Sequence, residues 1–144
     1  MNKTHTIMRI NQVILNCFYK LENGVICFVS RFEDKDIYVK TLNNEEKCVS
    51  AKDLYPIEIY TDMGSIFKSE SFINFGLINV MEDGKPIHHY IRYYIPNWGM
   101  NTVSVNYVHE FQQIMQIATG TDNVFLDFEL YFKKKQQNLN DDRL

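Results

Sequence analysis

The stretch "YVHEFQQIMQIATG", from Tyr107 to Gly120, decides the C-terminal part of the fold because its apolar residues recur at helical spacing. The apolar face of this predicted helix carries Tyr107, Phe111, Ile114 and Ala118, with Val108 and Met115 beside them. Thr119 and Gly120 are typical of the end of a helix. The sequence therefore predicts one amphipathic helix whose apolar face is buried in the core.

The opposite face of this helix is polar but uncharged. It carries His109, Gln112, Gln113 and Gln116, which follow the spacing i, i+3, i+4 and i+7. These side chains suit a binding interface, because they form hydrogen bonds without the desolvation cost of a charge. A solvated face is the other interpretation, since Gln is a good helix former. A buried hydrogen-bonded stripe, which would instead specify the fold, is the alternative that mutation would reveal.

Upstream of residue 60, short β-like runs alternate with turn signals. The runs are "QVILNCFYK" (12–20), "VICFVSRF" (25–32), "IYVKTL" (37–42) and "KCVS" (47–50). Gly24, which follows Asn23, indicates a hairpin turn between the first two. Pro56 confines residues 53–64 to an edge or a connection. We expect a small antiparallel N-terminal β-sheet or barrel.

The middle and the end of the chain supply the remaining elements. Ser69 to Gly76 has the pattern of a short helix, and residues 86–106 alternate as a second β-hairpin around "PNWG". The run "VFLDFELYF" (124–132) is compatible with a last strand. A chain of 144 residues with 45% apolar content suits one domain. The sequence thus predicts a single α+β domain over residues 1–132 and a disordered polar tail over 133–144.

The alternating run "IHHYIRYYI" (87–95) places two kinds of side chain on opposite faces of a strand. The predicted inward face carries Ile87, His89, Ile91, Tyr93 and Ile95. The other face carries His88, Tyr90, Arg92 and Tyr94. Aromatic rings interleaved with a guanidinium can stack on bases or anchor a protein partner. We favour a second interpretation, in which the margin of the core buries these tyrosines and leaves their polar tips in water.

Residues with catalytic or metal-binding spacing are missing from the sequence. No Ser or Cys lies in a nucleophile elbow, and no Gly-rich phosphate loop follows a strand. His88 and His89 point to opposite sides of a strand, so they cannot chelate one metal ion without a third element. The sequence predicts no enzymatic activity, no metal site and no cofactor.

Charge and cysteine usage limit the partners and the compartment. With 15 Lys and Arg against 18 Asp and Glu, the net charge of −3 gives no long-range attraction for nucleic acid. No apolar run approaches the roughly 20 residues of a membrane span, and the polar N-terminus lacks a signal core. We expect Cys17, Cys27 and Cys48 to be reduced and buried. The predicted location is the cytoplasm, without membrane contact.

The Tyr107–Gly120 segment also resembles a signature of short proteins of bacteriophages and integrated mobile elements. That signature is Tyr-Val-His-Gln-Leu-Gln, an apolar aromatic run, and Leu-Thr-Gly. The residues that match it in register are Tyr107, Val108, His109, Gln112, Thr119 and Gly120, whereas Glu110, Phe111, Gln116 and Ala118 depart from it. "RINQVI" (9–14), "YPIEI" (55–59) and "FINFGL" (72–77) are similar to the upstream segments of the family. The resemblance implies a small α+β protein of a mobile element, acting inside a bacterial host cell, and carries no assigned activity.

Together these observations predict a non-enzymatic protein that binds and inhibits or modulates host machinery, such as an anti-CRISPR or other anti-defence factor. Its partner would be a host protein or a ribonucleoprotein complex; this step is analogy with other small phage proteins. One alternative is a small single-stranded nucleic-acid-binding module that uses Tyr90, Arg92 and Tyr94. Another is a structural or assembly protein of a phage particle. The oligomeric state is left open by the sequence.

Overall fold

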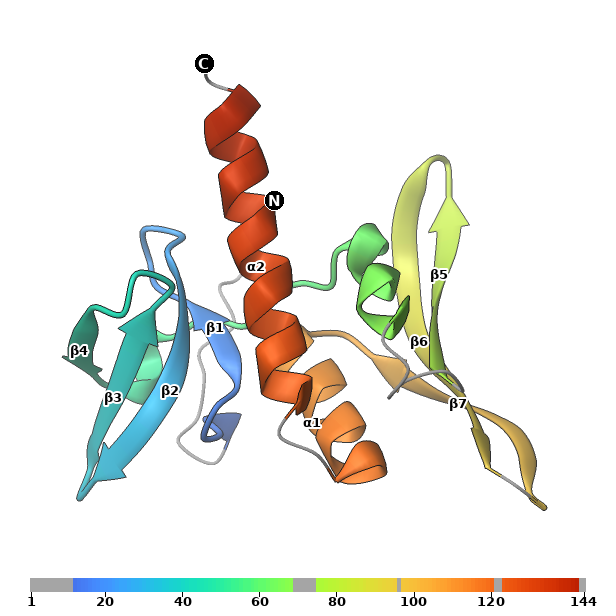
Figure 1. The fold of residues 1–144 in the computed structure, drawn as a ribbon, viewed down its shortest axis with the longest axis horizontal. Helices are drawn as coiled ribbons and strands as arrows, with labels where there is room; N and C mark the ends of the chain where they lie inside the picture. Colours follow the sequence, from blue (N-terminus) through green and yellow to red (C-terminus); the bar gives the residue numbers. More distant parts are fainter. Residues whose placement is uncertain (1–11, 69–74, 96, 121–122, 143–144) are drawn as a thin grey trace. The chain divides into compact units, whose positions relative to one another are not determined.

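The chain adopts an α+β fold made of two compact units (Figure 1). The computed structural model describes residues 12–68, 75–95, 97–120 and 123–142. The first unit comprises Met1–Ile57 with Phe132–Leu144, and the second comprises Glu58–Tyr131. The α+β class predicted from the sequence is confirmed. The range expected to form a single domain, 1–132, therefore contributes to both units.

The first unit is built on a four-stranded antiparallel sheet in the order β1-β2-β3-β4. The strands are β1 (Phe18–Lys20), β2 (Ile26–Glu33), β3 (Asp36–Thr41) and β4 (Glu46–Val49), followed by the 3-10 turn η2 (Ala51–Asp53). Each strand falls within or beside a predicted run, although only the last three residues of the run 12–20 are paired as β1. Gly24, at φ 85°, lies in the predicted turn between β1 and β2. The sheet is open and not a closed barrel.

Both faces of the sheet are buried along β1 and along residues 27–29 of β2. On one face Cys17, Tyr19, Cys27 and Val29 join a core with Ile37, Val39, Leu54 and Val13. On the other face the ring of Phe18 lies 5.6 Å from that of Phe28 and 5.2 Å from that of Phe132. The alternation of side chains along a strand thus sends Phe18 and Tyr19 into two separate clusters. The hydroxyl of Tyr19 donates to the carbonyl of Gln12 at 2.7 Å and accepts from the amide of Ile14 at 3.0 Å.

The cysteines separate into two buried thiols and one exposed thiol. Cys17 and Cys27 are fully buried, as predicted, and burial raises the pKa of each thiol to about 12. They therefore behave as small apolar residues. The expectation is wrong for Cys48, which is exposed because it pairs with Tyr38 on the face opposite to the buried Ile37 and Val39.

The second unit contains a three-stranded antiparallel sheet in the order β5-β6-β7. Its elements are the 3-10 helix η3 (Thr61–Lys68), β5 (Phe75–Glu82), β6 (Lys85–Ile95) and β7 (Gly99–Val105). The predicted hairpin over 86–106 is confirmed as β6 and β7. The helix predicted over Ser69–Gly76 falls mainly on 69–74, which lie outside the described residues, and its last two residues instead begin β5.

A two-residue turn joins β5 to β6. Glu82 pairs with Lys85, and the two residues between them, Asp83 and Gly84, have φ values of 52° and 77°. Positive φ at both central positions is the requirement of a type I′ hairpin turn, for which Asp-Gly is a preferred sequence. This turn places β5 beside β6 as a strand that the sequence reasoning did not predict.

Two helices follow the sheet. The predicted helix is confirmed as α1 (Val108–Thr119), which ends at Gly120 with φ 62°. At its start, the carboxylate of Glu110 accepts hydrogen bonds from the amides of Asn106 and Tyr107 at 2.9 and 3.0 Å. The second helix, α2 (Asn123–Asp142), has its residues up to Tyr131 in the second unit and the rest in the first.

The prediction of a strand over 124–132 and of a disordered tail over 133–144 is wrong for the described residues, since α2 continues to Asp142. Val124, Phe128 and Phe132 are buried, whereas Leu126 and Leu130 are 54% and 52% exposed. A spacing of four residues fits a helical face, and it also satisfies the alternation of a strand, so the apolar pattern alone did not distinguish them. The two exposed leucines decide for the helix.

Candidate binding surface on the β5-β6-β7 sheet

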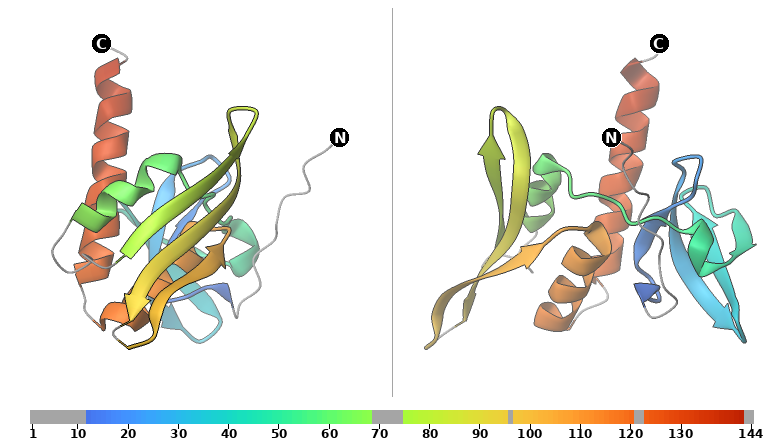
Figure 2. Two further views of the ribbon diagram at one scale, coloured as in Figure 1. Left: turned by 90° about the vertical axis from the view of Figure 1, so that its right-hand side faces the viewer. Right: turned by 180° about the vertical axis from the view of Figure 1, so that it is seen from behind.

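β6 is the middle strand of the second sheet (Figure 2). By the alternation of a strand, His88, Tyr90, Arg92 and Tyr94 lie on one of its faces. His88, Arg92 and Tyr94 are exposed and Tyr90 is half-buried. The structure therefore brings together the four residues that the sequence placed on one face. One interpretation of the sequence buried the two tyrosines at the margin of the core. The structure leaves them more exposed than that interpretation implies.

The opposite face of β6 is the covered one. Ile91 is fully buried there, and His89 Nδ1 lies 2.7 Å from Asn79 Oδ1 on β5. The amide nitrogen of Asn79 donates to the carbonyl of Thr61 at 2.9 Å, which ties η3 to this face (Figure 1). Burial lowers the pKa of His89, so the neutral imidazole is favoured. Because η3 covers this face, the opposite face of β6 is the one that can contact solvent or a partner.

Ile87 was expected on the inward face but is 48% exposed. His88 pairs with Val80 and Pro86 pairs with Met81, so Ile87 is an extra residue without an opposite partner in β5. This arrangement is a β-bulge, and Pro86 suits it because proline has no amide hydrogen for the ladder. The alternation predicted from the sequence therefore holds only from His88 onward.

Arg92 lies across the sheet toward β5. It pairs with Gly76, and a β-carbon built at that glycine would lie 3.6 Å from Arg92 Nη2. The absence of a side chain at Gly76 therefore leaves space into which the guanidinium extends. Among the described residues, no carboxylate lies within ion-pair distance of Arg92. Its charge is thus available to a group from another molecule.

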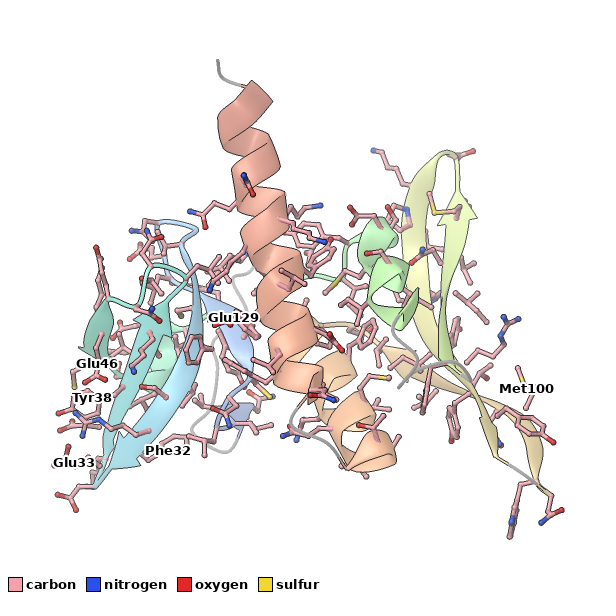
Figure 3. The ribbon with its side chains drawn as sticks, viewed as in Figure 1. Phe32, Glu33, Tyr38, Glu46, Met100 and Glu129 are labelled. Atoms are coloured by element: carbon pink, nitrogen blue, oxygen red, sulfur yellow. The ribbon has the colours of Figure 1, made fainter. Side chains whose placement is uncertain are left out.

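Arg31 in the first unit shows the opposite situation. Its guanidinium lies 3.7 Å from the ring centroid of Tyr38 and is paired with Glu33 at 2.6 Å and with Glu46 at 3.0 Å. Figure 3 shows Tyr38, Glu33 and Glu46 beside one another on the first sheet. The two carboxylates raise the pKa of Arg31. Because its charge is satisfied within the sheet, Arg31 is a poorer candidate for a binding residue than Arg92.

The tip of the β6-β7 hairpin extends the aromatic surface. Trp98 is 82% exposed, Met100 is 57% exposed and Tyr94 is 46% exposed. Asn97 and Gly99 adopt positive φ values of 72° and 82°, and this tight turn carries Trp98 outward between them. Met100 pairs with Tyr94 across the two strands, and Figure 3 shows it on β7. The tetrapeptide "PNWG" predicted the turn, but the sequence pattern did not predict Trp98 and Met100 as surface residues.

We call the set Tyr90, Arg92, Tyr94, Trp98 and Met100 the β6-β7 surface. Its composition is that of the centre of a protein interface, where Tyr, Trp, Met and Arg are enriched. The only formal charges within the three strands are Glu82, Lys85 and Arg92, so the sheet has no basic stripe. A phosphate backbone would find few counter-charges on it.

The His/Gln stripe of α1 is placed differently from the expectation. His109 is 6% exposed and Gln112 is fully buried, whereas Gln113 and Gln116 are half-buried. The predicted surface stripe is therefore wrong for its first two members. His109 stacks on Tyr107, with ring centroids 5.8 Å apart, and burial lowers its pKa while Glu110 opposes that shift.

The buried face of α1 is rotated about a quarter of a turn from the predicted one. Val108, Phe111, Gln112 and Met115 are fully buried, whereas Ala118 is exposed and Tyr107 and Ile114 are only partly buried. The ring of Phe111 packs edge-on against Phe128 of α2 at 5.2 Å, which fixes this rotation. Part of the His/Gln stripe, which was predicted to face away from the core, is thus buried by packing.

The described residues contain neither a metal-binding cluster nor a membrane-spanning helix. In the described ranges, no group of three or more His, Cys, Asp or Glu side chains is arranged to hold a metal ion. None of the helices that the structure describes combines the length and the apolar character needed to cross a bilayer. Comparison of the chain with protein-family models, curated protein sequences and solved structures finds no match. The resemblance of the α1 segment to phage and mobile-element proteins is therefore left as an expectation.

Proposed function

We propose that this protein is a non-enzymatic binding protein that attaches to a partner protein through the β6-β7 surface. The observation that carries the proposal is the exposure of Trp98, Met100 and Tyr94 on the same hairpin as Arg92, an arginine whose charge is not used within the described chain. Rigid aromatic side chains and arginine supply most of the binding energy in many protein interfaces. Soluble proteins rarely leave such a patch exposed without a use for it.

The identity of the partner rests on the resemblance of Tyr107–Gly120 to proteins of phages and mobile elements. Under that resemblance, the protein acts in the cytoplasm of a bacterial host and occupies a surface of host machinery in a stoichiometric complex. The specific form of the proposal is an anti-defence factor, with an anti-CRISPR role as its first case. Its partner is then a host protein or a ribonucleoprotein complex. This step is an analogy with other small phage proteins.

The test compares two exposed positions in a plaque assay. Cells with an active CRISPR system would express the wild-type protein, Trp98→Ala or Ile117→Ala, and then meet a phage that the system targets. Trp98 and Ile117 are both 82% exposed, but only Trp98 belongs to the β6-β7 surface. We expect the wild type and Ile117→Ala to restore plaques and Trp98→Ala to lose most of this effect, because a hot-spot aromatic contributes about 2 kcal/mol or more to binding.

Affinity capture from the same cells supplies the second measurement. Under the proposal, one defence component co-purifies with the wild type and with Ile117→Ala, and it is depleted with Trp98→Ala. Failure of the wild type both to restore plaques and to enrich any partner would refute the anti-defence role. Equal capture by both variants would place the binding surface elsewhere on the molecule.

The alternation of Tyr90, Arg92 and Tyr94 favours a second candidate, a single-stranded nucleic-acid-binding module in which bases stack on the two rings. The few cations of the sheet make it the weaker candidate. Electrophoretic shifts with single-stranded RNA and DNA at low and physiological salt would distinguish the two. Because electrostatic attraction is strongest at low salt, no binding under that condition would remove this candidate.

A further inference from the structure

The two sheets have four edge strands, and three of them are protected against pairing with another chain. An unprotected edge offers a row of amide and carbonyl groups, and proteins block it with short strands, charges, bulges or covering segments. At β1, the amide of Lys20 donates to the carbonyl of Tyr55 at 3.0 Å, and the amide of Tyr55 donates back at 2.8 Å. At β4, the strand has only four residues and carries Glu46 and Lys47.

The β5 edge is protected by its twist and by a charge at its end. The bulge at Ile87 of β6, opposite Val80 and Met81, increases the local twist of the strand pair, and Glu82 adds a charge at the end of β5. The helix η3 packs on the covered face of β5, with a β-carbon at Gly64 placed 3.7 Å from the side chain of Leu77, so it covers the face of this strand and not its edge. An added strand would therefore meet a twisted edge with a charged end.

The β7 edge has none of these protections. Its seven residues, "GMNTVSV", include no charge and no proline, and they pair with β6 in an unbroken register from Gly99 to Val105. Within the described part of the chain, β7 pairs with no strand other than β6. The bridge between Glu58 and Tyr107 begins only after the strand has ended. This row of backbone groups can be satisfied by an extended strand from another molecule.

We infer that β7 pairs antiparallel with β7 of a second copy of this chain, forming a two-fold symmetric dimer with a continuous six-stranded sheet. All seven residues pair only when the two-fold axis passes through Thr102, so that Thr102 lies opposite Thr102 of the second copy. Met100 then lies opposite Ser104. Threonine pairs across strands are favourable, and the neutral strand opposes no like charges. This self-complementarity identifies a second copy as the occupant.

The dimer does not depend on the proposed function, but it changes what that function can do. Arg92 pairs with Thr102 in β6 and β7. In the dimer the two Arg92 residues lie three strand spacings apart, or about 14 Å. Side chains of both Arg92 residues are on the same face of the joined sheet, because a two-fold axis perpendicular to the sheet preserves the face. Two copies of the β6-β7 surface would then form one continuous, two-site surface.

The test places a charge on the proposed axis. Thr102→Lys and Thr102→Asp each oppose like charges in a homodimer, whereas a mixture of the two variants opposes unlike charges. Analytical ultracentrifugation over a wide concentration range should show a concentration-dependent dimer for the wild type. Each single variant should raise the dimer Kd about fivefold or more, and the equimolar mixture should recover the dimer. High salt should weaken the recovered heterodimer.

Matched controls separate the edge from the rest of the sheet. His88→Lys and His88→Asp place the same charges at an exposed position on β6, away from the β7 edge, and should leave the wild-type dimer unchanged. Circular dichroism and melting curves establish that all four variants are folded. A wild type that is monomeric at every concentration would overturn the inference. The inference would also be overturned if both Thr102 variants dimerised as tightly as the wild type. It would be overturned as well if a mixture of the two folded variants failed to recover the dimer. Capture experiments with Trp98→Ala report on the proposed function separately.

Discussion

Replacing Gln112 with alanine should destabilise the protein much more than the same replacement at Gln113. Gln112 is fully buried on α1, whereas its neighbour Gln113 is half-buried. Both substitutions remove the same atoms from adjacent positions in one helix, so the change in helix propensity is the same. The difference between the two free energies of unfolding therefore measures the burial of the amide group.

The size of the effect follows from what the truncation removes. Loss of a buried amide leaves its partner groups unsatisfied and removes a packed methylene, which together cost about 2–4 kcal/mol. The substitution at Gln113 should cost less than about 1 kcal/mol. In a cooperative unit of the size of Glu58–Tyr131, each kcal/mol lowers the Tm by roughly 4–8 °C. Gln112→Ala should therefore melt roughly 10 °C or more below the wild type.

Urea unfolding followed by circular dichroism at the helical band measures both free energies, and a thermal melt gives the two Tm values. The slopes of the unfolding curves must agree, so that the comparison refers to the same unfolded surface. Equal losses at the two positions would refute the buried placement of Gln112 and would return the His/Gln stripe to the protein surface.

Three further outcomes are expected. Phe111→Ala should cost about 3–5 kcal/mol, and a double-mutant cycle with Phe128→Ala should give a coupling of about 0.5–1.5 kcal/mol in urea unfolding. Gly84→Ala should cost about 1–2 kcal/mol because φ is +77° there. Gly64→Ala should be nearly neutral in the same assay, because the new β-carbon would lie 3.7 Å from its nearest neighbour, the side chain of Leu77. Because burial lowers the folded-state pKa of His109, the unfolded state binds more protons below the ordinary pKa of 6.5. The free energy of unfolding should then decrease as the pH falls below 6.5, by at most about 1.4 kcal/mol per pH unit for this residue. Urea unfolding of His109→Asn at several pH values should show a weaker dependence of this free energy on pH.

Local patterns predicted the elements that are governed by local chemistry. The helix at Val108–Thr119 and the hairpin of β6 and β7 follow from apolar spacing and from turn residues such as Gly120 and Gly99. Strand β5 could have been predicted too, because Asp83-Gly84 between two β-like runs is a strong hairpin signal. The apolar residues near Phe75 also fit a helix, and that interpretation concealed the strand.

Tertiary packing decided what the sequence could not predict. The contact between Phe111 and Phe128 sets the rotation of α1, and so it determines that Gln112 is buried while Ala118 is exposed. Apolar spacing on α1 alone contains no information on the partner helix. For the candidate site, strand alternation predicted the face of Arg92. The outward position of Trp98 depends on the positive φ values of the turn, which the tetrapeptide "PNWG" did not make explicit.

The division of the chain between its units has a consequence for synthesis on the ribosome. The sheet of the first unit is complete in sequence by residue 57, but Phe132, which packs against Phe18, is translated much later. At about 5–20 residues per second, that ring appears roughly 4–15 s after Ile57. The contiguous segment Glu58–Tyr131 is fully translated before the older sheet has its last aromatic neighbour. The nascent N-terminal sheet thus lacks one aromatic neighbour of Phe18 until the final helix is translated, and a stop codon before residue 132 would remove a contact from the part of the protein that was made first.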